Sequence, residues 1–451
     1  MRQAPLRAIC LLLALIAAAS AAWADAPPVS GLPDVNLRDN VTRTVLGNGL
    51  TLLVVEDHDT DIVGVEMLFR VGQANEDDSS AGITHLIQNI LVQRMNKSKD
   101  PKVNYFEAKG SLLSGSATPD YAEIALMTDA KHLPELLGIV ARSVAQRQFT
   151  DDEVNEERRK MVEFLESDQR VFKAIYEIFL QQFYRYHPYR QPQDGHAASV
   201  RQLTKAKLEK YYARFWAPNK TVIAVVGNVD RNKVLEIVKH EMAAMVPTDD
   251  KRLEVSWEPK PVEKEIYLTS GSNLAWILLG FPAPGLKSPD YTPMKLMSTI
   301  LGEGLSSRLW VELRERHGLA YEVGGMYPEL DGPSHMIDYT ITTPNHLNEA
   351  QSRIFKEIER IKSVSVSSDE LEAAKRRLIG HYLLERETSK GRAFNLALQE
   401  MLGSGYHADL LTVDRIKKVT REDVLRVARL YLTNYTLLVA RPRGSSMPFF
   451  R

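Results

Sequence analysis

The spacing of apolar residues divides the chain into short alternating segments and longer helical ones. The sequence TRTVLGNGLTLLVVED predicts a β-hairpin around Asn48-Gly49, because both residue types tolerate the positive φ of a tight primed turn. VGVEMLFRVG, residues 63–72, predicts a further strand. Apolar residues then recur at helical spacing, which predicts helices over 83–95, 152–166 and 203–215.

Three segments of the first half recur in the second half, about 210–217 residues later. AGITHLIQNIL from Ala81 aligns with YTPMKLMSTIL from Tyr291, so that Leu91 and Leu301 correspond. The other matches pair the sequence from Asp151 with that from Ser368, and the sequence from Leu203 with that from Val419. A period this long indicates a duplicated domain, not an array of small repeats.

Strands followed by several amphipathic helices in each half predict an α+β fold. We expect two homologous domains, each with a mainly antiparallel sheet flanked by helices. The predicted domains are 35–245 and 266–445. Residues 246–265 are rich in charge and proline without helical period, and are predicted to form the linker.

Residues 1–24 have the pattern of a secretory signal peptide. Arg2 and Arg7 precede an apolar run, and Ala22-Trp23-Ala24 offers a small-residue cleavage site. The alternative is an uncleaved membrane anchor, for which the apolar run is short. The only cysteine, Cys10, lies in this segment, so the mature chain is expected to contain no thiol. A formal net charge of −1 gives no electrostatic reason to expect nucleic acid as a partner.

The helix predicted over 83–95 carries the most informative polar residues. Ile83, Leu86, Ile87, Ile90 and Leu91 have the spacing of a core-facing stripe, while His85 and Asn89 lie four residues apart on another face. Two histidines at that spacing can bind Zn²⁺, with a glutamate before the second one acting on water, as in H-x-x-E-H. Here Gln88 and Asn89 replace the glutamate and the second histidine.

GITHLIQN resembles the zinc helix of the pitrilysin/insulinase family of metallopeptidases. The resemblance implies two homologous halves facing each other in a clam-shell arrangement. It also implies a third zinc ligand, a glutamate, in the window 164–166, where Phe164 stands in register between Glu163 and Glu166. Glutamine is no base near neutral pH and an asparagine amide is a poor zinc ligand. We therefore expect no zinc and no catalytic residue in this chain alone, and interpret His85 as a remnant or interior histidine.

The second half resembles the family most closely in GEGLSSRLWVELRERHGLAYEVGG, residues 302–325. In the family, an arginine and a tyrosine seven residues later reach the zinc half and bind substrate. Arg314 and Tyr321 match that spacing and are predicted to bind substrate. The alternative is that Arg314 pairs with Glu312 or Glu315 while Tyr321 packs in the sheet.

Two further segments resemble the family in the first half. Residues 110–126 resemble the edge strand that pairs with an extended substrate, but Ser114-Gly115 replaces the frequent Asn-Ala. Because glycine weakens a strand, substrate pairing here is in doubt. His187, in YHPYRQP, is interpreted as structural and not catalytic.

These residues lead to a hypothesis about function. The resemblance implies a non-catalytic subunit of a periplasmic zinc metallopeptidase, which pairs with a zinc-bearing paralogue and contributes Arg314 and Tyr321 to the binding of extended peptides. Zinc is expected in the partner. The alternative hypotheses are a stand-alone peptide-binding or scaffold protein without hydrolysis, and an active peptidase with altered ligands.

Overall fold

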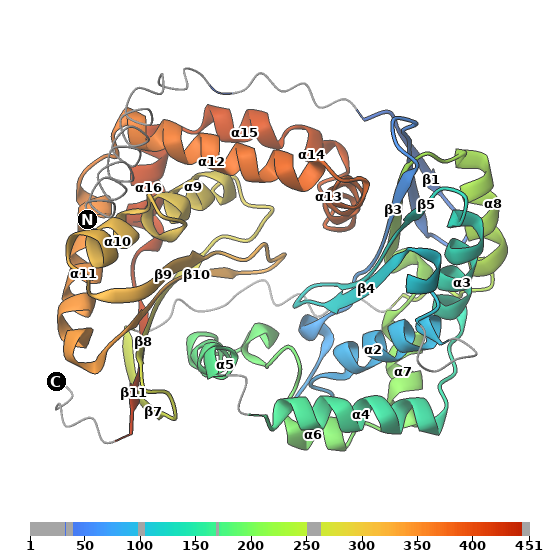
Figure 1. The fold of residues 1–451 in the computed structure, drawn as a ribbon, viewed down its shortest axis with the longest axis horizontal. Coiled ribbons are helices and arrows are strands. Elements are labelled where there is room, and N and C mark those ends of the chain that lie inside the picture. Colours follow the sequence, from blue (N-terminus) through green and yellow to red (C-terminus); the bar gives the residue numbers. More distant parts are fainter. Residues whose placement is uncertain (1–31, 33–38, 98–103, 168–170, 250–262, 444–451) are drawn as a thin grey trace, which may run out of the picture. The chain divides into compact units, whose positions relative to one another are not determined.

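The computed structural model describes residues 32, 39–97, 104–167, 171–249 and 263–443, and those from 39 onward belong to one unit (Figure 1). The described strands form two sheets, one from each half of the sequence. The first sheet contains β1 (Val41–Val45), β2 (Thr51–Glu56), β3 (Ile62–Phe69), β4 (Leu112–Ala117), β5 (Ala122–Asp129) and β6 (Thr221–Gly227). The second contains β7 (Lys264–Ser270), β8 (Ala275–Ala283), β9 (Ala320–Met326), β10 (Ser334–Thr342) and β11 (Thr436–Pro442).

The two sheets have the same topology apart from β1. Their strand orders are β1-β2-β6-β3-β5-β4 and β7-β11-β8-β10-β9. One neighbouring pair in each sheet is parallel, β2 with β6 and β7 with β11, and all the other pairs are antiparallel. The predicted α+β fold with two homologous, mainly antiparallel sheets is confirmed.

The described helices follow the strands in both halves, and several of them begin at Ser, Thr or Asp residues that cap them. In the first half they are α2 (Ile83–Asn96), α3 (Leu133–Ala145), α4 (Asp151–Leu165), α5 (Val171–Phe183), α6 (Ala197–Arg201), α7 (Lys205–Phe215) and α8 (Arg231–Met242). In the second half they are α9 (Tyr291–Gly302), α10 (Arg308–Trp310), α11 (Leu347–Ser363), α12 (Ser368–Arg386), α13 (Ser389–Met401), α14 (His407–Leu410), α15 (Thr412–Lys418) and α16 (Arg421–Tyr431). Thr150 and Thr204 accept hydrogen bonds at the starts of α4 and α7. The bounds of α2, α4 and α7 confirm the three predicted helices to within two residues. Among the described residues, no helix is both long and apolar enough to cross a bilayer.

The hairpin between β1 and β2 differs in detail from the primed turn that the sequence predicts. Within the described residues only Gly49 of the turn has a positive φ, +88°, and the turn closes with hydrogen bonds between Leu46 and Leu50 and between Gly49 and Leu46. The Asn48 side chain donates to the carbonyl of Met242, 2.9 Å away. Asn48 therefore anchors the turn to the end of α8 instead of adopting a left-handed conformation.

Each half contributes one helix to the sheet of the other half. Helix α5 comes from the first half but packs on β8 and β11, where Phe179 is fully buried and lies against Gly280. Helix α13 comes from the second half but packs on β3, β5 and β6, with Leu396 and Ala397 in the shared core (Figure 1). Each sheet therefore packs against a helix from the other half of the sequence.

Buried polar groups also join the two halves. Asp120, after β4, accepts hydrogen bonds from the Tyr189 hydroxyl (2.6 Å) and from the backbone N–H of Asp331 (2.8 Å). Arg70 and Lys287 each lie 2.8 Å from the Asp331 carboxylate. These groups fix the loop between β9 and β10 against the end of β4.

The domain boundaries remain a prediction. Residues 1–24, the predicted signal peptide, and most of the predicted linker lie outside the described residues. β7 begins at Lys264, two residues before the predicted second domain. Because α5 and α13 each cover the sheet of the other half, a boundary in the sequence does not separate two independent cores.

Candidate functional site

The start of α2 is held by a buried carboxylate that the sequence analysis missed. Glu76 accepts hydrogen bonds from the backbone N–H groups of Gly82 (2.8 Å) and Thr84 (2.9 Å). Burial raises the pKa of Glu76, and the hydrogen bonds from Thr84 and Gly82 partly offset that rise. Gly82 has a φ of +90°, so this entry into the helix favours glycine.

His85 lies beside a second buried carboxylate, which the sequence analysis also missed. Its Nδ1 is 2.9 Å from Oδ1 of Asp194, and the other oxygen of Asp194 pairs with the Lys173 ammonium. Burial would raise the pKa of Asp194, but the contacts with His85 and Lys173 outweigh burial and hold the pKa below its ordinary value. In the sequence, only its position just after YHPYRQP distinguishes Asp194 from other aspartates.

Gln88 and Asn89 occupy the remaining positions of the motif. Gln88 is 2% exposed and its amide lies against Gly115 of β4, so closely that any side chain at 115 would have to displace it. Asn89 is half-buried on the same helix. Gln88 and Gly115 are therefore a matched pair, which explains the glycine in the edge strand.

The predicted third-ligand positions lie at the end of α4. Glu163 is exposed and lies 2.7 Å from Arg159, Phe164 is 47% exposed, and Glu166 lies 2.6 Å from Arg201. Among the residues that the structure describes, no three His, Cys, Asp or Glu side chains form a group that could hold a metal.

The donor set around α2 does not fit a family zinc ion. Of the motif positions, only His85 is a good ligand, and its Nδ1 already faces a carboxylate. Glu163 and Glu166 are each paired with an arginine. We derive no chemical step through zinc at this helix, and the zinc content of the chain remains a prediction.

The edge strand lies where the sequence analysis placed it. β4 pairs with β5 and forms one edge of the first sheet. An edge strand has a row of main-chain groups that can pair with an added strand. Ser114 and Gly115 lie in its middle, and Gln88 packs behind Gly115.

Arg314 lies on one turn of π-helix, Val311–Arg316, that continues α10. Its guanidinium carbon lies 5.0 Å from the centre of the Trp310 ring, and its Nη1 donates to the carbonyl of Ala320, 3.4 Å away. A π-turn inserts a residue into a helix and is frequent at functional sites. This turn brings Arg314 to the strand residue that precedes Tyr321.

Neither Arg314 nor Tyr321 is neutralised or buried. Within the described part of the chain, no carboxylate is paired with Arg314, while nearby Glu312 pairs with Arg353 (2.6 Å) and Arg316 (3.3 Å). Tyr321 is 59% exposed at the start of β9. The Arg314 guanidinium contacts the backbone of the residue before Tyr321, and both side chains are open to a ligand. Their role in binding substrate remains a prediction.

His187 is buried and helps to join the two halves. Its Nδ1 accepts a hydrogen bond from the backbone N–H of Tyr189, 3.3 Å away, and its ring lies tilted against the Tyr189 ring, with 3.9 Å between the ring centres. The Tyr189 hydroxyl in turn accepts from the N–H of Gly332, at 3.1 Å. These contacts hold the ring in the joint between the halves, and the interpretation of His187 as structural remains a prediction.

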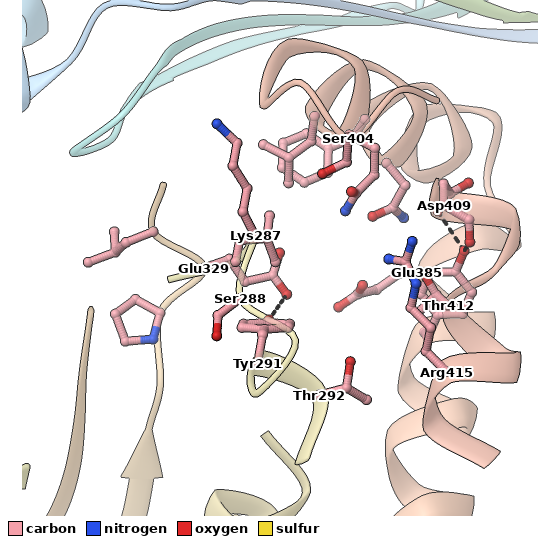
Figure 2. A pocket seen from close by; sticks show the side chains of 18 of the residues that line it. Lys287, Ser288, Tyr291, Thr292, Glu329, Glu385, Ser404, Asp409, Thr412 and Arg415 are labelled. Carbon is pink, nitrogen blue, oxygen red and sulfur yellow. Dashed lines mark hydrogen bonds between the residues drawn. The ribbon is translucent and has the colours of Figure 1, made fainter. Parts of the chain in front are cut away.

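A cavity of about 1230 Å³ is lined by both halves. The turn between β4 and β5 contributes residues 118–121, and the second half contributes the loop before α9 and parts of α12, α13 and α15. Figure 2 shows polar side chains from several of these elements pointing into it, including Lys287, Glu329 and Arg415. The cavity is large enough to hold several residues of a peptide.

Family models and known proteins agree on the ancestry of this chain. Residues 51–192 match the model described as insulinase (peptidase family M16), and residues 202–378 match the model described as peptidase M16 inactive domain. The chain is 24% identical to a Helicobacter pylori protein named zinc protease PqqE, over 88% of this chain and 92% of that protein. It is 26% identical to an uncharacterized zinc protease of Mycobacterium bovis, over 89% of this chain and 93% of the other.

Solved structures share the fold. A protease from Helicobacter pylori has a TM-score of 0.81 at 23% identity, with 90% of this chain and 100% of that chain covered. A protein from Pseudomonas fluorescens, described as a peptidase M16 inactive domain, has a TM-score of 0.79 at 21% identity, with 91% and 100% covered. With two matching models along one chain and a duplicated α+β fold, the protein belongs to the insulinase, or M16, family of peptidases.

Proposed function

We propose that this chain is a non-catalytic subunit of a zinc metallopeptidase. Under this proposal it pairs with a zinc-bearing paralogue, which holds the metal and the catalytic base. The mature chain works in the periplasm after its signal peptide is removed. The match of residues 202–378 to a peptidase M16 inactive domain is compatible with this role, while the curated relatives are named zinc proteases.

The observation that carries the proposal is the contrast between the two halves. In the first half, Gln88 and Asn89 replace the base and a ligand, and His85 faces Asp194. In the second half, Arg314 stacks on Trp310 and lacks a carboxylate partner among the described residues, next to the exposed Tyr321. An arginine that pairs with no carboxylate among the described residues, together with an exposed phenol, suits a peptide carbonyl or a developing oxyanion in the site of another subunit.

The test uses the complex purified from its native source through a tag on this chain. Arg314→Ala is expected to lower kcat/KM for a peptide substrate on the order of tenfold to a hundredfold, because a charged hydrogen-bond donor is removed. Arg316→Ala, two residues along the same turn, is the matched control and should leave turnover unchanged. Equal turnover by the Arg314→Ala complex would remove Arg314 from the site.

A stand-alone peptide-binding protein is the second candidate. It is favoured by the 1230 Å³ cavity, which this chain lines with both of its own halves, and by the open edge of β4. This candidate predicts peptide binding by the isolated chain, with no partner and no hydrolysis.

A further inference from the structure

A second cavity, of about 220 Å³, lies between α9, α12 and α15. It shares part of its lining with the large cavity, so the two meet there. The shared residues are Tyr291, Thr292, Glu329, Tyr382, Glu385 and Thr412. Figure 2 labels five of them where they face the large cavity: Tyr291, Thr292, Glu329, Glu385 and Thr412. We call the shared part the mouth of the smaller cavity.

The lining beyond the mouth includes several polar side chains beside the apolar Leu378 and Ile416. Helix α12 contributes Arg377 and His381, and α9 contributes Lys295 and Thr299. In the duplication, Lys295 and Thr299 stand at the positions of His85 and Asn89. The face of the helix that carries the degenerate zinc motif in the first half therefore lines this cavity in the second half.

The only carboxylate beyond the mouth among the described lining residues, Glu303, is already satisfied. It lies 3.1 Å from the Lys295 ammonium, and it accepts hydrogen bonds from the hydroxyls of Ser298 (3.2 Å) and Thr299 (3.3 Å). Lys295 and Glu303 thus neutralise each other. The charge that remains beyond the mouth is the positive charge of Arg377.

Arg377 is placed by a glycine. Gly304 has a φ of +86°, and the Arg377 guanidinium lies where a side chain at 304 would stand. The Arg377 side chain is half-buried, and no carboxylate within the described ranges is paired with it. A guanidinium held in a fixed place without a partner is suited to bidentate contact with a carboxylate.

We propose that the smaller cavity binds the C-terminal carboxylate of a peptide lying in the large cavity, with Arg377 as its partner. The proposal rests on the proposed peptide-binding role of the chain. The peptide enters past Tyr291 and Thr412 at the mouth, and its free end stops at Arg377. At the mouth, Glu329 accepts a hydrogen bond from the Tyr291 hydroxyl, 2.7 Å away, but keeps its charge. Glu329 and Glu385 therefore both oppose an incoming carboxylate, and the contact with Arg377 has to outweigh them.

The test compares two probes that differ only at the C-terminus: fluorescein-labelled pentaalanine with a free carboxylate, and the same peptide as its C-terminal amide. Fluorescence anisotropy with the full mature chain should show at least about tenfold tighter binding of the free acid, because an ionised hydrogen-bond partner is lost in the amide. Arg377→Gln should abolish that difference and Arg377→Lys should restore part of it. Arg376→Gln is the matched control, since Arg376 precedes Arg377 on α12 but does not line the cavity.

The outcomes separate this inference from the proposed function. Equal binding of acid and amide by the unmodified chain would overturn the role of Arg377 and leave peptide binding intact. Binding of neither probe would overturn the inference together with the peptide-binding candidate. An unfolded Arg377→Gln variant would not rescue the inference, because the comparison of acid and amide on the unmodified chain decides it alone.

Discussion

His335 on β10 is predicted to make the joint between the two halves sensitive to acid. Its ring is 2% exposed, and its two nitrogens lie 2.8 Å from the hydroxyls of Tyr184 and Tyr176, both from the first half. Burial lowers the pKa of His335 from 6.5 to about 3. The folded state thus holds this imidazole neutral, while the unfolded chain takes up a proton below pH 6.5.

The sign and size of the effect follow from this difference. The stabilising contribution is complete above pH 6.5 and is lost as the pH falls from 6.5 toward 3. The expected slope is about 1.4 kcal/mol of unfolding free energy per pH unit. Because the slope reaches its full value only well below pH 6.5, the loss between pH 6.5 and 4.5 is about 2 kcal/mol, which is a large share of the stability of an ordinary domain.

Urea unfolding at a series of pH values measures this contribution. His335→Phe keeps an aromatic ring but cannot titrate. The unfolding free energy of this variant should therefore fall less steeply with decreasing pH, by about that slope. Subtracting the two curves cancels carboxylates that titrate in the same range. His240→Phe, at a side chain that is 84% exposed, is the control and should keep the original slope. If the His335→Phe curve runs parallel to that of the unmodified chain, the imidazole is not held neutral and the reasoning is wrong.

Three further predictions concern helix α5, the stacking of Arg314 on Trp310, and the degenerate zinc motif. Phe179→Ala should lower the unfolding free energy by about 3–5 kcal/mol in urea, because Phe179 fills the joint between α5 and the second sheet; a loss below 1 kcal/mol would contradict that packing. Trp310→Leu should lower kcat/KM of the native complex a few-fold while Trp310→Phe retains it, since stacking on an exposed cation contributes about 0.5–1 kcal/mol; assembly, checked by gel filtration, should not change. Gln88→Glu with Asn89→His should bind no stoichiometric zinc and show no peptidase activity in the isolated chain, because Glu163 and Glu166 are paired with arginines and the described residues form no metal-binding group; elemental analysis with one zinc per chain would refute this.

Local pattern was sufficient to predict much of the fold. Helical spacing located α2, α4 and α7 to within two residues, since each has a continuous apolar stripe and a start that the chain can cap. The duplicated pattern predicted two related sheets. The turn at Asn48-Gly49 was predicted with the wrong geometry, because Asn48 bonds to Met242, a partner 194 residues away that no local rule includes.

The contacts that define the site were not predictable in the same way. Asp194 reaches His85 from more than a hundred residues away, and Gln88 is matched to Gly115 on another element. The apolar pattern of α5 and α13 shows that each helix buries a face, but it does not show which sheet receives it. The π-turn that carries Arg314 has no local sequence signal, because its distinguishing feature is a hydrogen-bond shift and not a residue type.

The most direct test of the central claim is the composition of the native complex. The tagged mature chain is purified under mild conditions from its native source, and the proteins that accompany it are identified and quantified by mass spectrometry. The proposal predicts a near-equimolar M16-family chain with an intact H-x-x-E-H motif. Recovery of this chain alone, as a monomer or homodimer, would contradict the subunit role.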